Sequence, residues 1–131
     1  MCVSTREGVQ FPSVSAKLEA GKSVRWDWEM YGFSTEAKVK ALESNKRILV
    51  EWFAYGAPTD LEWVFTARPD DTTLVSITNS GFGGSAQEIA NLAVASTEGF
   101  AFVLAGAKAL LEHGVLLNLV PDRFPDGLPR A

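Results

Sequence analysis

The sequence predicts an α+β fold in which a curved antiparallel sheet of five to six strands is followed by one long C-terminal helix. Between residues 23 and 79, apolar and polar side chains alternate with a period of two, which is typical of strands with one dry and one wet face. After Ser85 the apolar residues change to helical spacing. At 131 residues the chain is expected to form a single domain, 1–131, with its own core.

Each strand is predicted from alternation between turn signals. The alternation predicts that Ala37, Val39 and Ala41 share one face of their strand. Val9–Leu18 is expected to be extended but irregular, because Pro12 cannot donate to a ladder. Short breaks at 19–22, 44–46, 56–60 and 69–71 favour an up-and-down sheet. The predicted strands are Ser23–Tyr31, Thr35–Leu42, Arg47–Tyr55, which is apolar on nearly both faces and therefore central, Leu61–Arg68 and Thr72–Asn79.

The C-terminal part is predicted to be helical in two segments. Ser85 is a good N-cap for a segment that runs to about Ala95, and a second segment is expected from Thr97 to about His113, with Gly114 as its C-cap. Gly99 and Gly106 each cost such a helix roughly 1 kcal/mol relative to alanine. Their presence suggests close approach to the sheet or room for a ligand.

Composition excludes several classes of function. With 16 acidic and 12 basic residues the net charge is -4, and the scattered basic residues do not favour binding to nucleic acid. The single cysteine, Cys2, has no partner for an internal disulfide, which favours a reducing compartment. Neither a signal peptide nor an uncharged apolar run of membrane-spanning length is recognised. We therefore expect a soluble cytoplasmic protein without membrane insertion.

Catalytic and metal-binding motifs are not evident in the sequence. His113 is the only histidine and is interpreted as a surface residue at a helix end. Nothing near Cys2 would lower its pKa. Asp70-Asp71 is interpreted as a solvated turn, and Gly81–Gly84 as a strand-to-helix hinge that lacks the features of a P-loop or dinucleotide motif. We expect no cofactor, no metal and no catalytic residue.

Tryptophan and phenylalanine side chains at alternating strand positions suggest either a packed core or a binding site for an apolar small molecule. Glu51, on the central strand, is either solvated or a partly buried acid with a raised pKa, and only the second would suggest proton chemistry. The predicted ligand-binding residues are Trp26, Trp28, Met30, Val39, Val50, Trp52, Trp63, Phe65, Ile77, Asn79, Phe100 and Leu104.

A family resemblance is carried by motifs spread over about nine-tenths of the chain. These motifs are Trp26–Gly32 (WDWEMYG), Asn45–Ile48 before Glu51-Trp52, Trp63–Phe65, Thr78–Phe82, Glu98–Phe100, Leu104, Lys108–Glu112 and Pro121–Pro125. From about Val9 onward the chain resembles the family related to the C-terminal domain of the activator of the Hsp90 ATPase, within the START-like helix-grip (SRPBCC) superfamily. The resemblance implies a sheet that packs on the long C-terminal helix. It carries no shared catalytic signature.

The chain departs from this family mainly at its start. Relatives usually begin with an edge strand and two short helices, whereas here only Met1–Gln10 precede the matching region. Single departures are Asn79, where relatives often have histidine, and Phe100, where they often have tryptophan. An N-terminally shortened module would leave a sheet edge and apolar surface uncovered, which predicts a homodimer or a domain-swapped pair. A misplaced start codon is the competing explanation.

Three functions follow from the residues and the resemblance. The leading hypothesis is non-enzymatic binding of a hydrophobic or aromatic small molecule between sheet and helix. The alternatives are an enzyme of the polyketide cyclase or aromatase kind, with Glu51 or Asn79 projecting inward, and a stress-response module that interacts with an Hsp90-type chaperone. The family name alone does not decide among them.

Overall fold

A computed structural model describes residues 13–14, 18–28, 33–53 and 56–126. The chain divides into two compact units, Met1–Phe82 and Gly83–Ala131. The first unit contains the strands and the second contains the helices.

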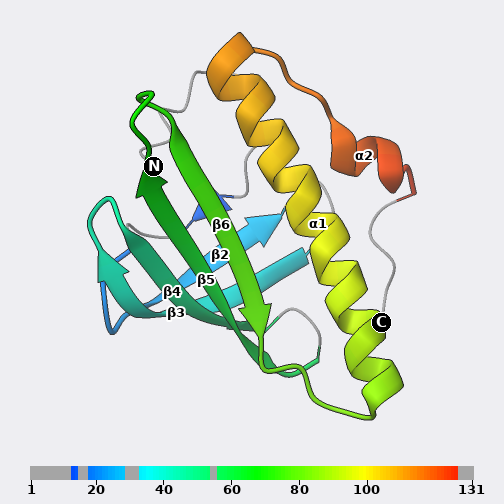
Figure 1. Ribbon diagram of the computed structural model, residues 1–131. Helices are drawn as coiled ribbons and strands as arrows, with labels where there is room; N and C mark the ends of the chain where they lie inside the picture. Colours follow the sequence, from blue (N-terminus) through cyan, green and yellow to red (C-terminus); the bar gives the residue numbers. More distant parts are fainter. Residues whose placement is uncertain (1–12, 15–17, 29–32, 54–55, 127–131) are drawn as a thin grey trace. The chain divides into compact units, whose positions relative to one another are not determined.

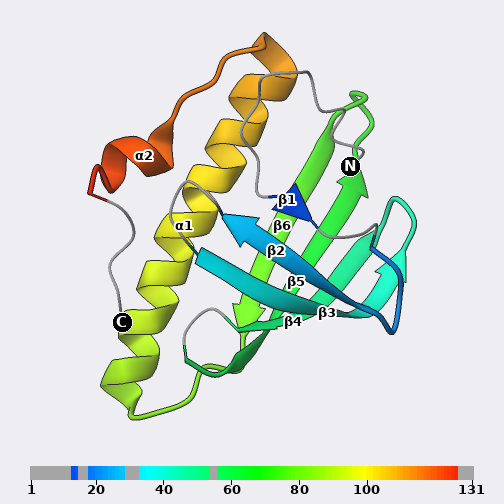
Figure 2. The ribbon, with the colours of Figure 1, turned by 180° about the vertical axis from the view of Figure 1, so that it is seen from behind.

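The first unit is a six-stranded antiparallel sheet in which each strand pairs with its neighbour in sequence (Figure 1). The predicted up-and-down sheet of five to six strands is therefore confirmed. Figure 2 shows the short β1 beside β2. The strands are β1 (Ser13–Val14), β2 (Ser23–Trp28), β3 (Phe33–Glu43), β4 (Arg47–Phe53), β5 (Pro58–Ala67) and β6 (Thr73–Ser80).

Three predicted turns have the backbone geometry that tight turns require. Gly21, Asn45 and Asp71 have φ values of 81°, 60° and 61°, in the left-handed region that glycine, asparagine and aspartate tolerate best. The first turn closes with a hydrogen bond from Lys22 N–H to Glu19 C=O at 3.1 Å. These turns connect β1 to β2, β3 to β4 and β5 to β6.

The predicted break over 56–60 is wrong at its second half, because β5 begins at Pro58. Pro58 is the first residue of the strand and pairs with Phe53. A proline at that position is compatible with a sheet, where its missing N–H costs least. Thr59 and Asp60 therefore belong to the strand and pair with Trp52 and Glu51.

The prediction that Ala41 shares a face with Ala37 and Val39 is wrong, because β3 contains a β-bulge. The register runs from Val39 opposite Val50 to Ala41 opposite Leu49, so Lys40 is an extra residue on β3. An extra residue reverses the alternation of the side chains that follow it. Ala41 therefore shares a face with Leu49 rather than with Ala37 and Val39.

The buried side chains of the sheet alternate along β3, as expected for a strand with one dry face. Thr35, Ala37 and Val39 are buried, whereas their neighbours Ser34, Glu36, Lys38 and Lys40 are exposed. On the other strands the buried apolar residues are Val24, Val50, Trp52 and Leu61.

The second unit contains one continuous helix, α1 (Ala86–His113), instead of the two predicted segments. Ser85 is its N-cap, as predicted, and forms a capping box with Glu88: the Glu88 N–H donates to Ser85 Oγ at 3.3 Å, and the Ser85 N–H donates to Glu88 Oε2 at 2.7 Å. The predicted C-cap, Gly114, has φ 66° and donates its N–H to Leu110 C=O at 2.9 Å.

A short helix, α2 (Leu119–Arg123), was not predicted because Pro121 is a breaker in most helical contexts. Here the proline lies in the first turn, where its missing N–H has no helical partner in any case. Arg123 Nε donates to Glu98 Oε1 at 2.7 Å, which connects α2 to α1.

By length and composition, α1 is the one helix in the described part of the chain that could cross a membrane. The core helices of soluble proteins meet the same criteria, so this finding is weak evidence for a membrane span.

Candidate functional site: the indole face of the sheet

The register assigns the side chains of the sheet to two chemically different faces. The first, which we call the indole face, carries three tryptophans: Trp26, Trp52 and Trp63. Two rows of residues paired across neighbouring strands also belong to this face. One row is Ala37, Trp52 and Thr59, and the other is Val39, Val50, Leu61 and Asn79. The second, which we call the charged face, carries Arg25, Glu36, Lys38, Lys40, Arg47, Glu51, Asp60 and Glu62.

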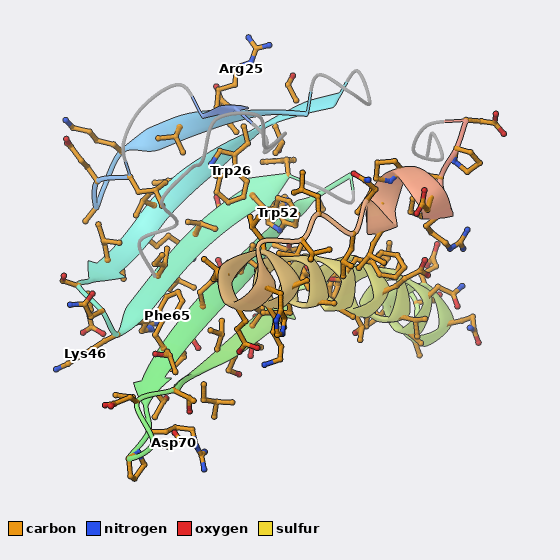
Figure 3. All side chains as sticks on the ribbon, turned by 90° about the horizontal axis from the view of Figure 1, so that it is seen from above. Arg25, Trp26, Lys46, Trp52, Phe65 and Asp70 are labelled. Atoms are coloured by element: carbon orange, nitrogen blue, oxygen red, sulfur yellow. The ribbon has the colours of Figure 1, made fainter. Side chains whose placement is uncertain are left out.

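Two indole rings lie against each other on the indole face. The ring centroids of Trp26 and Trp52 are 6.0 Å apart with an interplanar angle of 61°, an edge-to-face arrangement. Trp52 is 8% exposed, and Nε1 of Trp26 is buried. Figure 3 shows both rings on one side of the sheet, with Arg25 pointing away on the other.

A small polar group lies on the indole face beside these rings. Thr35 is directly opposite Trp26, and its hydroxyl donates to Phe53 C=O at 2.7 Å. Thr59 is opposite Trp52. Asn79 Nδ2 donates to Thr59 Oγ1 at 3.0 Å and to Asp60 C=O at 2.8 Å. Thr35 and Thr59 are 7% and 3% exposed, so these polar groups belong to the interior of the face.

Neither threonine was predicted as a site residue. Thr35 has the same strand parity as Ala37 and Val39, which was a usable signal in the sequence. Thr59 lay in the segment predicted as a break, so the alternation did not predict on which face of the sheet its side chain would lie. Threonine is common on both wet and dry faces of strands because its β-branched shape fits either.

The charged face is crossed by ion pairs. Lys40 Nζ, at the bulge, lies 2.8 Å from Asp60 Oδ1 and 3.9 Å from Glu51 Oε2. The hydrogen bond to Asp60 raises the pKa of Lys40, with the nearby carboxylates of Asp60 and Glu51 adding to the effect. Arg47 Nε lies 2.5 Å from Glu62 Oε2. These exposed pairs contribute little individually to stability.

Glu51 lies on the charged face, opposite Lys38, and its side chain is 39% exposed. The sequence left two alternatives open for Glu51, a solvated side chain or a partly buried acid, and the structure shows the solvated one. The acid-base role considered for it would require a position on the indole face, so that role is wrong for Glu51.

The structure brings eight of the twelve predicted ligand-binding residues onto the indole face. The backbone of Trp28 pairs with Phe33, but its side chain is outside the described residues, as is all of Met30. Phe100 and Leu104 lie on α1, in the second unit. Their ligand-binding role stays a prediction. The eight residues are Trp26, Val39, Val50, Trp52, Trp63, Phe65, Ile77 and Asn79.

The residues interpreted as non-catalytic have ordinary structural roles. His113 ends α1 with a side chain that is 70% exposed. Asp70 is in the predicted turn, where its carboxylate accepts from Thr72 Oγ1 at 2.5 Å and from Thr72 N–H at 3.2 Å, which lowers its pKa. Cys2 is outside the described residues. In the described part of the chain, no three His, Cys, Asp or Glu residues form a group suited to a metal ion.

Comparisons with known proteins identify solved structures of similar fold. A Staphylococcus saprophyticus protein of known structure is similar to the chain with a TM-score of 0.63 and 26% identity, over 80% of this chain and 72% of that one. DynU16, a protein of the dynemicin biosynthetic locus, has a TM-score of 0.64 and 26% identity, over 79% of this chain but only 37% of its own. No curated protein matches the chain.

These similarities confirm the predicted fold class, an α+β fold of the helix-grip kind with an antiparallel sheet and a long C-terminal helix. The fold is one used for ligand binding, and its family is typically soluble. Residues 9–112 match the family described as "Activator of Hsp90 ATPase homolog 1-like protein". Because this match spans most of the 131 residues, the chain belongs to that family.

Proposed function

We propose that the protein binds a hydrophobic or aromatic small molecule on the indole face of its sheet and does not act on it chemically. The observation that carries this proposal is the Trp26–Trp52 pair beside a few buried polar groups. Binding sites for small molecules typically combine apolar and aromatic walls with a small number of polar groups that fix orientation. Phe100 and Leu104 of α1 are proposed to complete the site.

A thermal-shift screen tests this proposal. Aromatic polyketides, steroids and long-chain fatty acids at increasing concentrations should raise the melting temperature of the wild-type protein if any of them binds the native state. Trp52→Phe should weaken that stabilisation. Phe53→Leu is a matched control, because Phe53 points to the opposite face and is 55% exposed. Absence of stabilisation by every compound would refute the proposal.

An enzyme of the cyclase or aromatase kind is the second candidate, supported by the similarity to a protein of the dynemicin biosynthetic locus. Such chemistry requires a proton donor or acceptor beside the substrate. Among the described residues, the acidic side chains of β3, β4 and β5 belong to the charged face. Asn79 faces the indole side, but its amide does not titrate. Conversion of a bound polyketide by the purified protein would favour this candidate.

A third candidate is interaction with an Hsp90-type chaperone in the stress response, which rests on the family description. Capture of the protein by immobilised Hsp90, together with a change in the ATPase rate of the chaperone, would support it. Unchanged ATPase activity at saturating protein would remove it.

We also propose a homodimer. β6 lies at an edge of the sheet formed by the described strands, and its eight residues include neither a charge nor a proline. Edge strands usually carry such protective residues, because they discourage pairing with another chain. Light scattering after size-exclusion chromatography should give twice the chain mass, and Ser76→Lys should shift it towards the monomer. A wild-type monomer at micromolar concentration would refute the dimer.

A cytoplasmic location is proposed on the basis of the single cysteine, which is incompatible with an internal disulfide. Fractionation of cells that express the tagged protein tests it, and recovery in the membrane or secreted fraction would contradict it.

A further inference from the structure

The indole N–H of Trp26 is a buried hydrogen-bond donor without an acceptor in the part of the chain that the structure describes. The indole nitrogen is a donor only, so it needs an oxygen or another acceptor to be satisfied. Leaving a buried donor unsatisfied is energetically costly, and native proteins contain few such groups. The position of this donor therefore requires an explanation.

The described polar groups of the indole face already form hydrogen bonds within the sheet itself. Thr35, opposite Trp26, donates to Phe53 C=O. Thr59 Oγ1 and Asp60 C=O accept the two described bonds from Asn79 Nδ2. These groups hold the β-strands together at that end of the sheet, and none of the described bonds reaches the Trp26 nitrogen.

We propose that the Trp26 N–H binds the oxygen of an incoming ligand, and that the ligand is a flat aromatic compound with an uncharged carbonyl oxygen. This inference rests on the proposed binding function and specifies its ligand class. The ring pair accounts for the aromatic part, since a ligand ring can stack on or meet the edge of either indole. The buried N–H of Trp26 accounts for the acceptor oxygen.

The charge distribution selects an uncharged oxygen over a carboxylate. The described cations of the sheet, Arg25, Lys38, Lys40 and Arg47, belong to the charged face. A carboxylate brought to Trp26 would lose its hydration without gaining a counter-ion, which is strongly unfavourable. A neutral carbonyl loses much less on leaving water and gains the hydrogen bond.

Two probes of nearly equal shape separate the hydrogen bond from apolar contact: 2-acetylnaphthalene carries the carbonyl, and 2-ethylnaphthalene lacks it. By titration, the ratio of the affinity for the acetyl compound to the affinity for the ethyl compound should be about three- to tenfold higher in the wild-type protein than in Trp26→Phe, the factor that one net hydrogen bond supplies. Trp26→Phe, which keeps a ring but removes the donor, should abolish that advantage. Phe53→Leu, on the opposite face, should retain it. 2-Naphthoate should bind more weakly than either.

The indole resonances of ¹⁵N-labelled protein supply a second measurement that does not depend on the variant. The chain has four tryptophans, hence four indole N–H signals. The acetyl probe should move one signal downfield, and the ethyl probe should not. If Trp26→Phe folds, the absence of that signal from its spectrum assigns the moving resonance to Trp26.

Three results of these experiments would overturn the carbonyl inference, either alone or together with the proposed function. The same affinity ratio in the wild-type protein and in Trp26→Phe, with no indole signal that distinguishes the two probes, would overturn the carbonyl inference and leave apolar binding intact. The same conclusion would follow if 2-naphthoate were preferred. Failure of both naphthalenes to bind, in a protein that other apolar compounds also fail to stabilise, would overturn the proposed function and this inference together.

Discussion

At the scale of single residues, the described polar groups of the indole face stabilise the sheet as well as shaping the candidate site. Asn79 joins β6 to β5 through two hydrogen bonds from its Nδ2 atom. One of its acceptors, Thr59, is almost fully buried. A polar group of this kind is costly to leave unpaired, so Asn79, which donates to it, is under structural constraint.

Asn79→Ala is expected to lower the free energy of unfolding by about 1–3 kcal/mol, because it removes both bonds and leaves Thr59 without its described donor. Urea denaturation measures this loss. Thr78→Val is the control: Thr78 is exposed on the other face, and the substitution keeps the β-branched shape. An equal loss in both variants would show that the bonds of Asn79 are not what stabilises this edge.

The capping box at the start of α1 predicts a pH dependence. The Ser85 backbone N–H and then the Ser85 hydroxyl lower the pKa of Glu88 below its ordinary value of 4.5. The carboxylate therefore adds stability above about pH 4.5, and that contribution is lost as the pH falls through the lower, folded-state pKa. Between pH 6 and pH 3, Glu88→Gln should lose less in melting temperature than the wild type. Parallel profiles would contradict this linkage.

At the scale of elements, the bulge at Lys40 determines which residues of β3 reach the indole face. It leaves Val39 and Val50 paired on one side and Ala41 and Leu49 paired on the other. The bulge also directs Lys40 to the charged face, where it meets Asp60 and Glu51. The extra residue at Lys40 thus allows the regularly alternating sequence of β3 to stay paired with β4, although the side chains after the bulge change face.

Two single-residue deletions in β3 should have unequal effects. Deletion of Lys40 removes the extra residue and keeps the facing on both sides, so the variant should fold with a modest loss of stability. Deletion of Lys38 shifts Phe33–Ala37 by one position relative to the rest and moves Thr35 and Ala37 off the dry face. It should lose several kcal/mol, on the order of two large core truncations. Circular dichroism melts compare the two, and equal melting temperatures would argue against the bulge.

Gly106 within α1 and Gly114 at its C-cap predict a matched pair of substitutions with opposite effects on stability. A Cβ placed on Gly106 meets no heavy atom within 4 Å, so Gly106→Ala should stabilise the protein by up to about 1 kcal/mol. Gly114 has φ 66°, where alanine is strained, so Gly114→Ala should destabilise by about 1–2 kcal/mol. Chemical denaturation checks both. Destabilisation by Gly106→Ala would reveal a close contact at that glycine, one of the two alternatives that the sequence left open.

At the scale of the whole molecule, the sequence predicted the order of strands and helix well, because alternation and capping are local signals. The bulge was not predictable, since the run Ala37–Ala41 reads as perfect alternation and the partner strand sets the register. The continuity of α1 was missed because Ser96, Thr97 and Gly99 are weak helix formers. In the structure, the Thr97 hydroxyl donates to Ala93 C=O at 2.8 Å, one turn back, within the helix.

The candidate site was only partly predictable for a related reason. The alternation of side chains along each strand identified the eight residues that share the indole face, but nothing in the sequence indicated that the indole nitrogen of Trp26 is buried. Pairing across strands placed Thr35 and Thr59 beside the rings. Such neighbours come from residues far apart in the chain, which periodicity does not connect.

The order of the strands has a consequence for how the chain emerges during synthesis. Since every strand pairs with the one made just before it, each new hairpin can join the growing sheet without waiting for distant sequence. We expect translation to assemble the sheet from β1 towards β6, so that ribosome-stalled chains become progressively resistant to protease as each hairpin leaves the exit tunnel.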